Sequence, residues 1–430
     1  MRFASPSTSV RSFLLLAVIL CSGAMAYSQT PPPPVLPLPP PEPPSINPCD
    51  NDGPVYWVWC RKQKYYDPIA SNKEHPGLVV GSVAPGGGLA GGFGYSRETV
   101  GPNWQTKFVT SARVSVKKYW ELDANLRLSR TPSSTTAPIA LGNLKVDIYG
   151  FVKDMPRVDF FGVGPESREQ DRAVFHYREA VAGGDISQPI KTWFDIGGAV
   201  EGIWPNIVRI TNPTVTSVER KFTEATAPGI DSQPAFVHLA AFARFKSPSQ
   251  WEARRFDYLF FYHVYQDVGD QRYSFRRFNA DLRNKFPLGA KDEIRIRGRV
   301  GLSETSEGQR VPFYLMETLG GSNIRGDDTL RGFRDYRFRD RDYVLVQTEY
   351  LHRLYSYIHL ILFYDFGKVA PSVSRFDEGR MRQTYGVGFV VVPRQLDNIL
   401  FRFYVALGSG EGSHTYFNGG LTGRGDRLTR

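Results

Sequence analysis

Polar and apolar residues alternate with a period of two along much of the chain. In 121–128 the odd positions are polar, from Glu121 to Arg127, and the even positions are apolar, from Leu122 to Leu128. The alternation returns in 277–286 and 293–302, where arginine dominates the polar set. Successive side chains of a β-strand point to opposite faces, so the pattern predicts strands with one polar and one apolar face.

We identify about sixteen candidate strands, many of them near 10 residues long, separated by alternately long and short connections. They are Gly88–Ser96, Lys107–Lys117, Trp120–Ser129, Asn143–Lys153, Val174–Gly183, Thr192–Trp204, Phe236–Phe245, Phe256–Gln266, Tyr273–Phe286, Glu293–Ser303, Pro312–Leu319, Tyr343–Tyr355, Ile358–Val369, Arg382–Val392, Asn398–Leu407 and His414–Leu421. Strands of a water-soluble sandwich also alternate. The strand number, the strand length and the charge on the polar faces favour an all-β fold, a transmembrane antiparallel β-barrel of about 16 strands.

The first 26 residues have the pattern of a secretory signal peptide. Arg2 and Arg11 precede an apolar run from Phe13 to Cys21, and Ala24-Met25-Ala26 provides a small-x-small cleavage pattern. An uncleaved anchor is the alternative, but a spanning helix needs about 20 apolar residues. We therefore expect an exported protein.

The rest of the chain divides by composition. Prolines dominate up to residue 48, so 27–48 is expected to be an extended linker, followed by a short periplasmic segment at 49–87. The barrel is expected at 88–422 and a tail at 423–430. Cys49 and Cys60 flank an aromatic stretch; in an oxidising periplasm they are a possible disulfide, with two free thiols as the alternative.

Charge and motifs exclude several classes of function. The formal net charge is +10, but the basic residues are interleaved with acids rather than clustered, so no nucleic-acid partner is expected. We find no zinc-ligand spacing, no HExxH or GxSxG motif and no plausible serine–histidine triad. We therefore expect no enzyme, no catalytic residues, no metal and no cofactor.

Two segments near the C-terminus suggest an internal contact. Phe363–Gly367 carries one acid, Asp365, on a strand whose opposite face is apolar, so the carboxylate must face the lumen. Strand parity places Glu349 in the same lumen. Adjacent carboxylates repel unless a cation lies between them, and Arg331 in the preceding long connection is the candidate. Lumenal arginines at 295, 297, 299 and 402 either pair with acids or line an anion-selective pore.

These residues resemble motifs of the BamA/TamA-type bacterial surface antigen superfamily. Leu330-Arg331-Gly332-Phe333 is similar to its lumen-loop motif, Gln347-x-Glu349-x-x-x-Arg353 to its twelfth-strand motif, and Phe363-x-Asp365-x-Gly367 to its thirteenth. The three motifs occur in this order within 290–421. The resemblance implies a sixteen-stranded barrel whose sixth extracellular loop enters the lumen. In that loop Arg331 would take the latch role, with Asp365 as its acceptor and Glu349 assisting. The other motif residues assigned to this acceptor site in the lumen are Arg353, Phe363 and Gly367.

The resemblance also implies a location and a function. Members lie in the bacterial outer membrane and insert outer-membrane proteins or translocate polypeptides, and some have no settled role. About 60 residues separate Ala26 from the first candidate strand, so we expect a member that lacks POTRA domains. Expected partners are outer-membrane lipid and unfolded outer-membrane or secreted polypeptides, with the chain as a monomer. A passive pore and a surface-antigen scaffold without transport are the alternatives.

The first candidate strand suggests where such a barrel would be weakest. Gly88–Ser96 contains four glycines, and the last candidate strand carries Gly419-Gly420. Glycine contributes no side chain to packing. We therefore expect a weak seam where the first and last strands meet.

Overall fold

The computed structural model describes residues 75–130, 144–247, 255–355, 358–391 and 401–419. The predicted signal peptide, proline-rich linker, Cys49–Cys60 disulfide and C-terminal tail lie outside these residues. In the described part of the chain, no helix is both long and apolar enough to cross a membrane.

In the described part of the chain, sixteen strands form one continuous antiparallel sheet in chain order. They are β1 (His75–Gly81), β2 (Ala90–Val100), β3 (Trp104–Ser115), β4 (Trp120–Arg130), β5 (Lys145–Phe160), β6 (Ala173–Lys191), β7 (Phe194–Val208), β8 (Phe236–Lys246), β9 (Arg255–Asp267), β10 (Phe275–Pro287), β11 (Asp292–Glu304), β14 (Asp342–Arg353), β15 (Ile358–Ala370), β16 (Arg382–Val391), β17 (Phe401–Gly408) and β18 (Gly412–Gly419). Two short strands, β12 (Glu317–Leu319) and β13 (Phe338–Asp340), pair separately. The single-turn helix α3 (Val218–Lys221) lies between β7 and β8.

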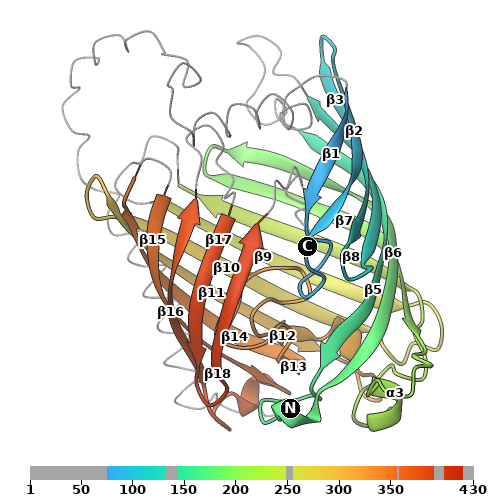
Figure 1. Cartoon of the computed structure of the whole chain (residues 1–430). Coiled ribbons are helices and arrows are strands. Elements are labelled where there is room, and N and C mark those ends of the chain that lie inside the picture. The colour runs from blue at the N-terminus through green and yellow to red at the C-terminus, as the bar shows by residue number, and fades with distance from the viewer. Residues whose placement is uncertain (1–74, 131–143, 248–254, 356–357, 392–400, 420–430) are drawn as a thin grey trace, which may run out of the picture.

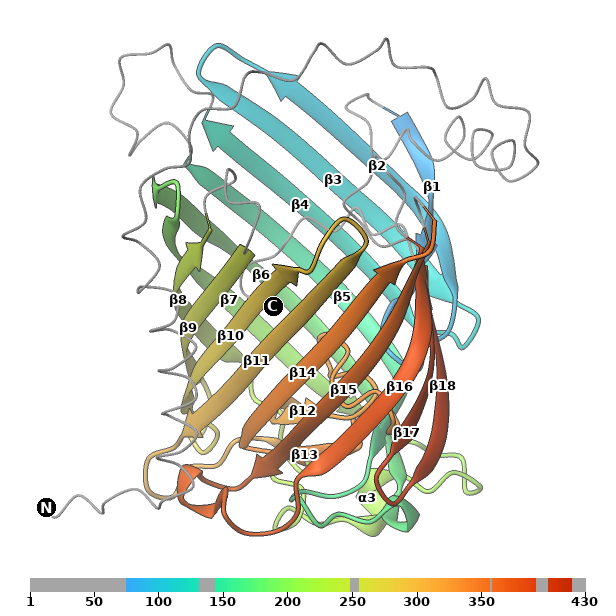
Figure 2. The same cartoon turned by 90° about the vertical axis from the view of Figure 1, so that its left-hand side faces the viewer.

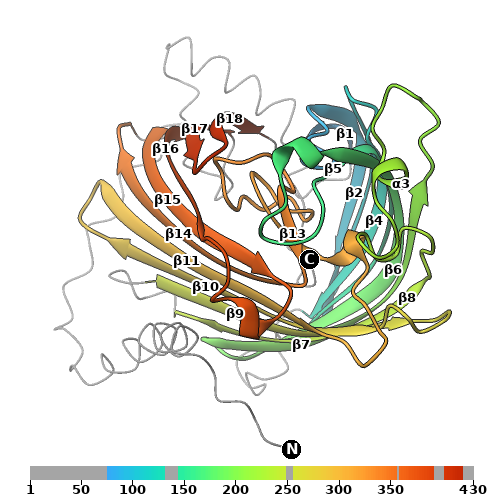
Figure 3. The same ribbon diagram turned by 90° about the horizontal axis from the view of Figure 1, so that it is seen from below.

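The sheet curls into a barrel, and its end strands β1 and β18 face each other (Figures 1 and 3). The long connections 161–172, 209–235, 305–341 and 371–381 all leave the same end of the barrel. Figure 3 looks at this loop-rich end, where α3 lies, and Figure 2 shows β12 and β13 enclosed by the strands. The barrel therefore has two different ends, and a loop enters it from one of them.

On the barrel strands, charged side chains are buried and apolar side chains are exposed, which is the reverse of the pattern in a water-soluble protein. On β4, Glu121 is fully buried while its neighbour Leu122 is 51% exposed, and on β7 Glu201 is 3% exposed while Val200 is 55% exposed. Outward apolar side chains and inward charged ones are what a lipid-embedded barrel requires. The alternation predicted from sequence is confirmed.

Fifteen of the sixteen predicted strands correspond to strands of the barrel, but the first strand was missed. β1 lies within 49–87, the segment predicted to precede the barrel, and pairs along its whole length with β2. Its sequence, HPGLVVG, has one proline and two glycines and no polar–apolar alternation, so the pattern gave no signal. The barrel therefore includes His75–Gly81, which lie before the predicted start at residue 88.

The predicted strand Pro312–Leu319 is wrong as a barrel strand. It forms a single 3-10 turn, Phe313–Leu315, and then β12, which pairs with β13 inside the barrel. Its apolar residues Phe313, Tyr314 and Met316 are buried in the lumen, so the segment lacks the polar face of a wall strand. Because β1 was missed and this segment was counted, the predicted total of sixteen was still correct.

The glycine-rich strand is the second strand, not the first, so it does not form the predicted seam. At Gly92 a Cβ would lie 1.9 Å from the carbonyl oxygen of Ala112 on β3. Glycine here permits close approach of two paired strands.

We expect a charge on the outer face to destabilise the barrel. Val200→Arg places a guanidinium mid-strand on the lipid face, which should lower the free energy of unfolding in lipid vesicles by about 2–4 kcal/mol. Urea titration of the refolded protein, followed by tryptophan fluorescence, measures this change. Glu307→Arg, on an exposed connection, is the control and should change stability by no more than about 0.5 kcal/mol. If both variants unfolded at the same urea concentration, Val200 would not face the lipid.

Candidate functional site: a loop latched inside the barrel

The connection between β11 and β14, residues 305–341, is termed here the latch loop. It runs inside the barrel and carries the β12–β13 hairpin (Figures 1 and 2). Apolar side chains from the loop and from the inner wall form one fully buried cluster: Leu319, Leu330, Phe333 and Phe338 from the loop, and Tyr343, Leu345 and Val369 from β14 and β15. Phe333 and Phe338 pack edge to face with ring centroids 5.1 Å apart. This cluster seats the segment that carries Arg331.

Arg331 lies between two carboxylates of the barrel wall. Its Nε and Nη2 atoms donate to the two oxygens of Asp365, at 2.9 and 2.5 Å. Its Nη1 donates to Oε1 of Glu349 at 2.5 Å. The planar guanidinium therefore makes a bidentate pair with one acid and a single contact with the other, a geometry that lysine cannot provide.

Strand register explains why the two acids meet. Across the β14–β15 pair, Gln347 is opposite Asp365 and Glu349 is opposite Phe363. Glu349 and Asp365 are therefore diagonal neighbours on one face of the sheet. Both were predicted from strand parity to face the lumen, and the structure places both against Arg331.

The arginine is almost completely removed from solvent, with 1% exposure. Its Cζ lies 3.7 Å from the centroid of the Phe363 ring and 5.5 Å from that of Tyr404. Burial alone would lower the pKa of Arg331, but the Asp365 and Glu349 carboxylates outweigh it and hold the pKa well above its usual value. The guanidinium stays charged, and its lost hydration is replaced by carboxylates and ring faces.

Two glycines of the motifs allow the loop to lie flush against the wall. A Cβ on Gly332 would lie 2.6 Å from the backbone of Leu407 and of Gly408, and the Gly332 amide donates to Thr384 Oγ1 at 3.2 Å. A Cβ on Gly367 would lie 2.8 Å from the Val344 carbonyl oxygen. Neither position has room for a side chain.

Arg353 does not take part in the latch, although its motif predicted that it would. It lies at the exposed end of β14, and its Nη2 donates to the carbonyl oxygen of Ala290. The remaining motif residues all lie at the contact between loop and wall: Leu330, Gly332, Phe333, Gln347, Phe363 and Gly367.

The lumenal arginines of the wall are paired with acids. Arg402 contacts Asp328 of the latch loop at 3.1 Å, and Arg299 contacts Asp327 at 3.0 Å. Arg297 contacts Asp281 at 2.7 Å, and Arg295 pairs with Glu293. These pairs support a structural role over an anion-selective pore. Within the described ranges, no group of three or more histidine, cysteine, aspartate or glutamate side chains is placed to hold a metal ion.

A second buried arginine, which sequence reasoning missed, clamps three distant segments together. The guanidinium of Arg337 donates to both oxygens of Glu411 at 2.6 to 2.9 Å, and to the carbonyl oxygen of Ser167 at 2.8 Å. It lies over the rings of Phe161 and Phe338, and its side chain is 2% exposed. Glu411 lies in the turn before the last strand, and Ser167 in the β5–β6 connection. In sequence, Arg337 is one of several alternating arginines and aspartates, and nothing distinguishes it from its neighbours.

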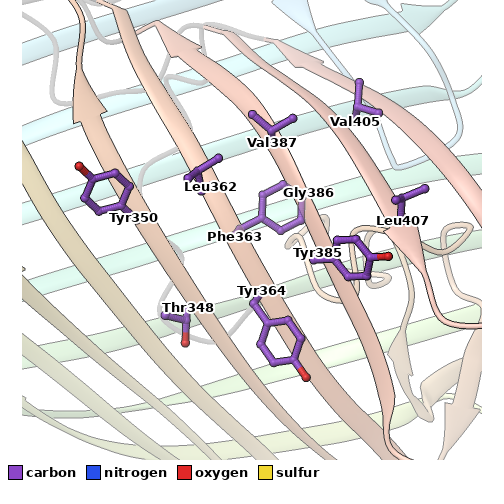
Figure 4. A pocket seen from close by; sticks show the side chains of 10 residues that line it. All are labelled: Thr348, Tyr350, Leu362, Phe363, Tyr364, Tyr385, Gly386, Val387, Val405 and Leu407. Carbon is purple, nitrogen blue, oxygen red and sulfur yellow. The ribbon is translucent and has the colours of Figure 1, made fainter.

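Outside the barrel, directly behind the latch, the lipid-facing surface is hollowed (Figure 4). The depression has a volume of about 600 Å³ and lies over β14 to β17, with apolar side chains such as Leu362, Val387 and Val405 around it. Phe363 and Gly386 also line it, and the Phe363 ring lies 2.5 Å from where a Gly386 Cβ would be. One aromatic ring therefore separates this depression from Arg331.

The first prediction for the site concerns the Arg331 pair. Arg331→Ala leaves Asp365 buried without its cation and should lower the free energy of unfolding by about 3–5 kcal/mol. Arg331→Glu should cost at least as much, because three acids then lie together. Combining Arg331→Glu with Asp365→Arg should recover part of the loss, measured by urea titration in lipid vesicles. A double variant no more stable than Arg331→Glu would show that the residues do not interact.

A second prediction compares two ion pairs of the same loop. Glu411→Ala leaves Arg337 buried and partly unpaired, so we expect a loss of about 3–5 kcal/mol. The pair between Arg334 and Glu169, 2.7 Å apart with side chains 44% and 38% exposed, is the control. Glu169→Ala should cost no more than about 1 kcal/mol. Equal losses in the two variants would mean that burial of the clamp contributes nothing.

Comparison with known proteins supports the fold. Neither a protein-family model nor a curated protein sequence matches this chain. Among solved structures, BamA from Haemophilus ducreyi lacking POTRA domains 1-3 is similar with a TM-score of 0.55 and 13% identity, over 82% of this chain and 70% of that chain. CdiB from Escherichia coli is similar with a TM-score of 0.54 and 11% identity, over 82% of this chain and 63% of that chain.

The similarity in structure is greater than the similarity in sequence. At 11% and 13% identity, what is shared is the arrangement of strands, and this chain spans less than two thirds of the CdiB chain. In this chain, the barrel also contains the inward loop and the Arg331–Asp365 contact described above. The chain has the fold of a BamA-type β-barrel.

Proposed function

We propose that this protein is an outer-membrane barrel of the BamA/TamA-type superfamily that inserts or translocates polypeptides. Its partners would be outer-membrane lipid and unfolded outer-membrane or secreted polypeptides, and it would act as a monomer without enzymatic activity. The observation that carries this proposal is the latch itself. In a barrel of this fold, an arginine of an inward loop is held by two acids of adjacent wall strands.

The packing of the loop-rich end favours a gated passage over an open pore. Phe313, Tyr314 and Met316 of the latch loop pack against Phe160 and Phe175 of the wall in one large buried cluster. This cluster occupies the lumen between the loop and the strands β5 and β6. Passage of a chain through the barrel would therefore require movement of the loop, and the latch would set the free energy of that movement.

The lumen offers a surface suited to an unfolded chain. Its wall is lined with charged groups, such as Arg297 with Asp281 and Arg244 with Asp257, which already have partners. Paired charges interact weakly with a passing peptide, because a new contact must replace an existing one. Such a lining supports transient contact rather than tight binding.

The proposal is tested by depletion and complementation in the native host. Depletion should lower the abundance of at least one other outer-membrane or secreted protein, measured by quantitative proteomics of membrane and medium. Wild-type protein and Arg334→Ala should restore it, while Arg331→Glu, expressed at the same level, should not. No change in any barrel or secreted protein upon depletion would overturn the proposal in favour of a surface scaffold.

Conductance in planar bilayers distinguishes a passive pore from a barrel that is gated by the latch loop. We expect little steady conductance from the wild-type protein, because the latch loop fills the loop-rich end. Deletion of 322–341 should produce larger and more frequent openings. A steady pore that the deletion leaves unchanged would show that the loop does not gate the lumen.

A further inference from the structure

A cavity of about 670 Å³ lies at the loop-rich end of the barrel. Its lining comes from parts of the chain that are far apart in sequence: the β1–β2 connection, the β3–β4 turn, the adjoining ends of β5 and β6, the β7–β8 connection, the latch loop and β18. Its size is within the range of about 300–1,000 Å³ of small-molecule sites. The cavity is separate from the latch, since neither Arg331 nor its two acids line it.

The charged side chains of the lining carry an excess of positive charge. Four basic residues line the cavity, Lys117, Arg157, Arg172 and Arg334, against two acids, Asp159 and Asp335. Arg172 is paired with Asp159 at 3.0 Å and Arg334 with Glu169 at 2.7 Å. Among the described residues, no ion pair involves Lys117 or Arg157. Both side chains are exposed, and the Lys117 ammonium donates to the Gly86 carbonyl oxygen at 2.8 Å, so these two cations without an acidic partner can turn toward an anionic group.

Within the part of the chain that the structure describes, Asp335, the second acid of the lining, has no basic partner of the kind that Arg172 provides for Asp159. Asp335 belongs to the latch loop, and its Oδ1 atom is shielded from solvent without a hydrogen-bond partner in the described structure. Burial, followed by the nearby Asp159 and Asp328 charges, raises the pKa of Asp335 to about 6, against the opposing hydrogen bonds from Ser322. A carboxylate oxygen left without a donor is costly, and because Asp335 lines the cavity, rotation of its carboxylate would let this oxygen accept hydrogen bonds from a ligand. Hydroxyl groups of a polyol are such donors, and Thr214 and Thr216 on the opposite connection add further polar partners.

We propose that this cavity is a binding site for a phosphorylated sugar, with Lys117 and Arg157 holding the phosphate and Asp335 accepting hydrogen bonds from sugar hydroxyls. Arginine and lysine are the usual protein partners of phosphate, through charge-assisted hydrogen bonds. The volume is far larger than a bare phosphate needs, so the sugar fills the remainder. The ligand would be either a free sugar phosphate or the phosphorylated headgroup of a membrane glycolipid at the mouth of the barrel.

Binding at this position would join the two ends of the sheet. The lining includes Gly86, which precedes β2, and Thr415 of β18, the last strand, together with the latch-loop residue Tyr336. Tyr336 already ties the loop to the β1–β2 connection, since its hydroxyl donates to the Pro85 carbonyl oxygen at 3.0 Å. A ligand that contacts all three segments stabilises the arrangement in which they are together.

The test uses the full-length protein in detergent micelles at pH 8 and low salt, with glucose 1-phosphate as the probe in isothermal titration calorimetry. Substituting Lys117 and Arg157 together by alanine should weaken binding by about tenfold or more, because each removes a charge-assisted contact. Asp335→Asn, which removes a negative charge but keeps a hydrogen-bonding group, should tighten binding of inorganic phosphate by several-fold. Arg168→Ala, an exposed arginine of the β5–β6 connection outside the cavity, is the matched control and should change nothing.

The outcomes separate the ligands and can overturn the proposal. Glucose 1-phosphate should bind more tightly than inorganic phosphate. Glucose alone should bind more weakly than glucose 1-phosphate. Phosphorylated lipopolysaccharide that binds while its dephosphorylated form does not would identify the glycolipid headgroup as the source, and binding of glucose 1-phosphate alone would identify the free sugar phosphate. Equal weakening by Arg168→Ala, or no effect of the Lys117 and Arg157 substitutions in a folded barrel, would overturn the site. Equal affinity for inorganic phosphate and glucose 1-phosphate would overturn the role of the sugar.

Discussion

The buried guanidinium of Arg331 fixes where the latch loop meets β14 and β15 of this barrel. It has left water almost entirely, and it is tolerated there because Asp365 and Glu349 offer three oxygens at hydrogen-bonding distance and Phe363 offers a ring face. The same is true of one acid: Asp365 is fully buried, and its negative charge would be unstable there without the cation. Neither the guanidinium nor the carboxylate would be stable in the interior without the other, so the position of the loop and the charge of the wall depend on each other.

The rest of the lumen follows from that position of the loop. With Arg331 placed, Leu330 and Phe333 are buried against the wall, and Asp327 and Asp328 reach Arg299 and Arg402 on either side of the latch. The loop then continues to Arg337, which joins it to the turn before β18 and to the β5–β6 connection. A displacement of the loop would therefore be felt at β14 and β15, at the last hairpin and across the lumen, which is the coupling that a gated passage requires.

The sequence predicts the parts of this arrangement that depend on strand periodicity. The inward orientation of Glu349 and Asp365 follows from a period of two, and the role of Arg331 follows from the need to neutralise them. What the sequence does not show depends on tertiary contacts. β1 has no alternation because its short sequence is mostly glycine, proline and valine, and Pro312–Leu319 has the composition of a strand but is held inside by the aromatic cluster. Arg337 differs from its neighbours only by what surrounds it after folding.

The buried ion pair is also compatible with the loop movement that the proposed function requires. Removing one partner by substitution leaves the other charge buried and uncompensated, which is costly. Withdrawal of the whole loop is different, because water enters behind it and both Arg331 and the two acids regain hydration. The free energy of opening would then be the small difference between paired and hydrated charges, plus the loss of burial of the loop's apolar side chains in its two clusters, which include Leu330 and Phe313. Charge therefore determines where the loop is seated, while the apolar contacts determine how firmly it is held, so a barrel of this kind can have a precisely positioned loop that is still able to move.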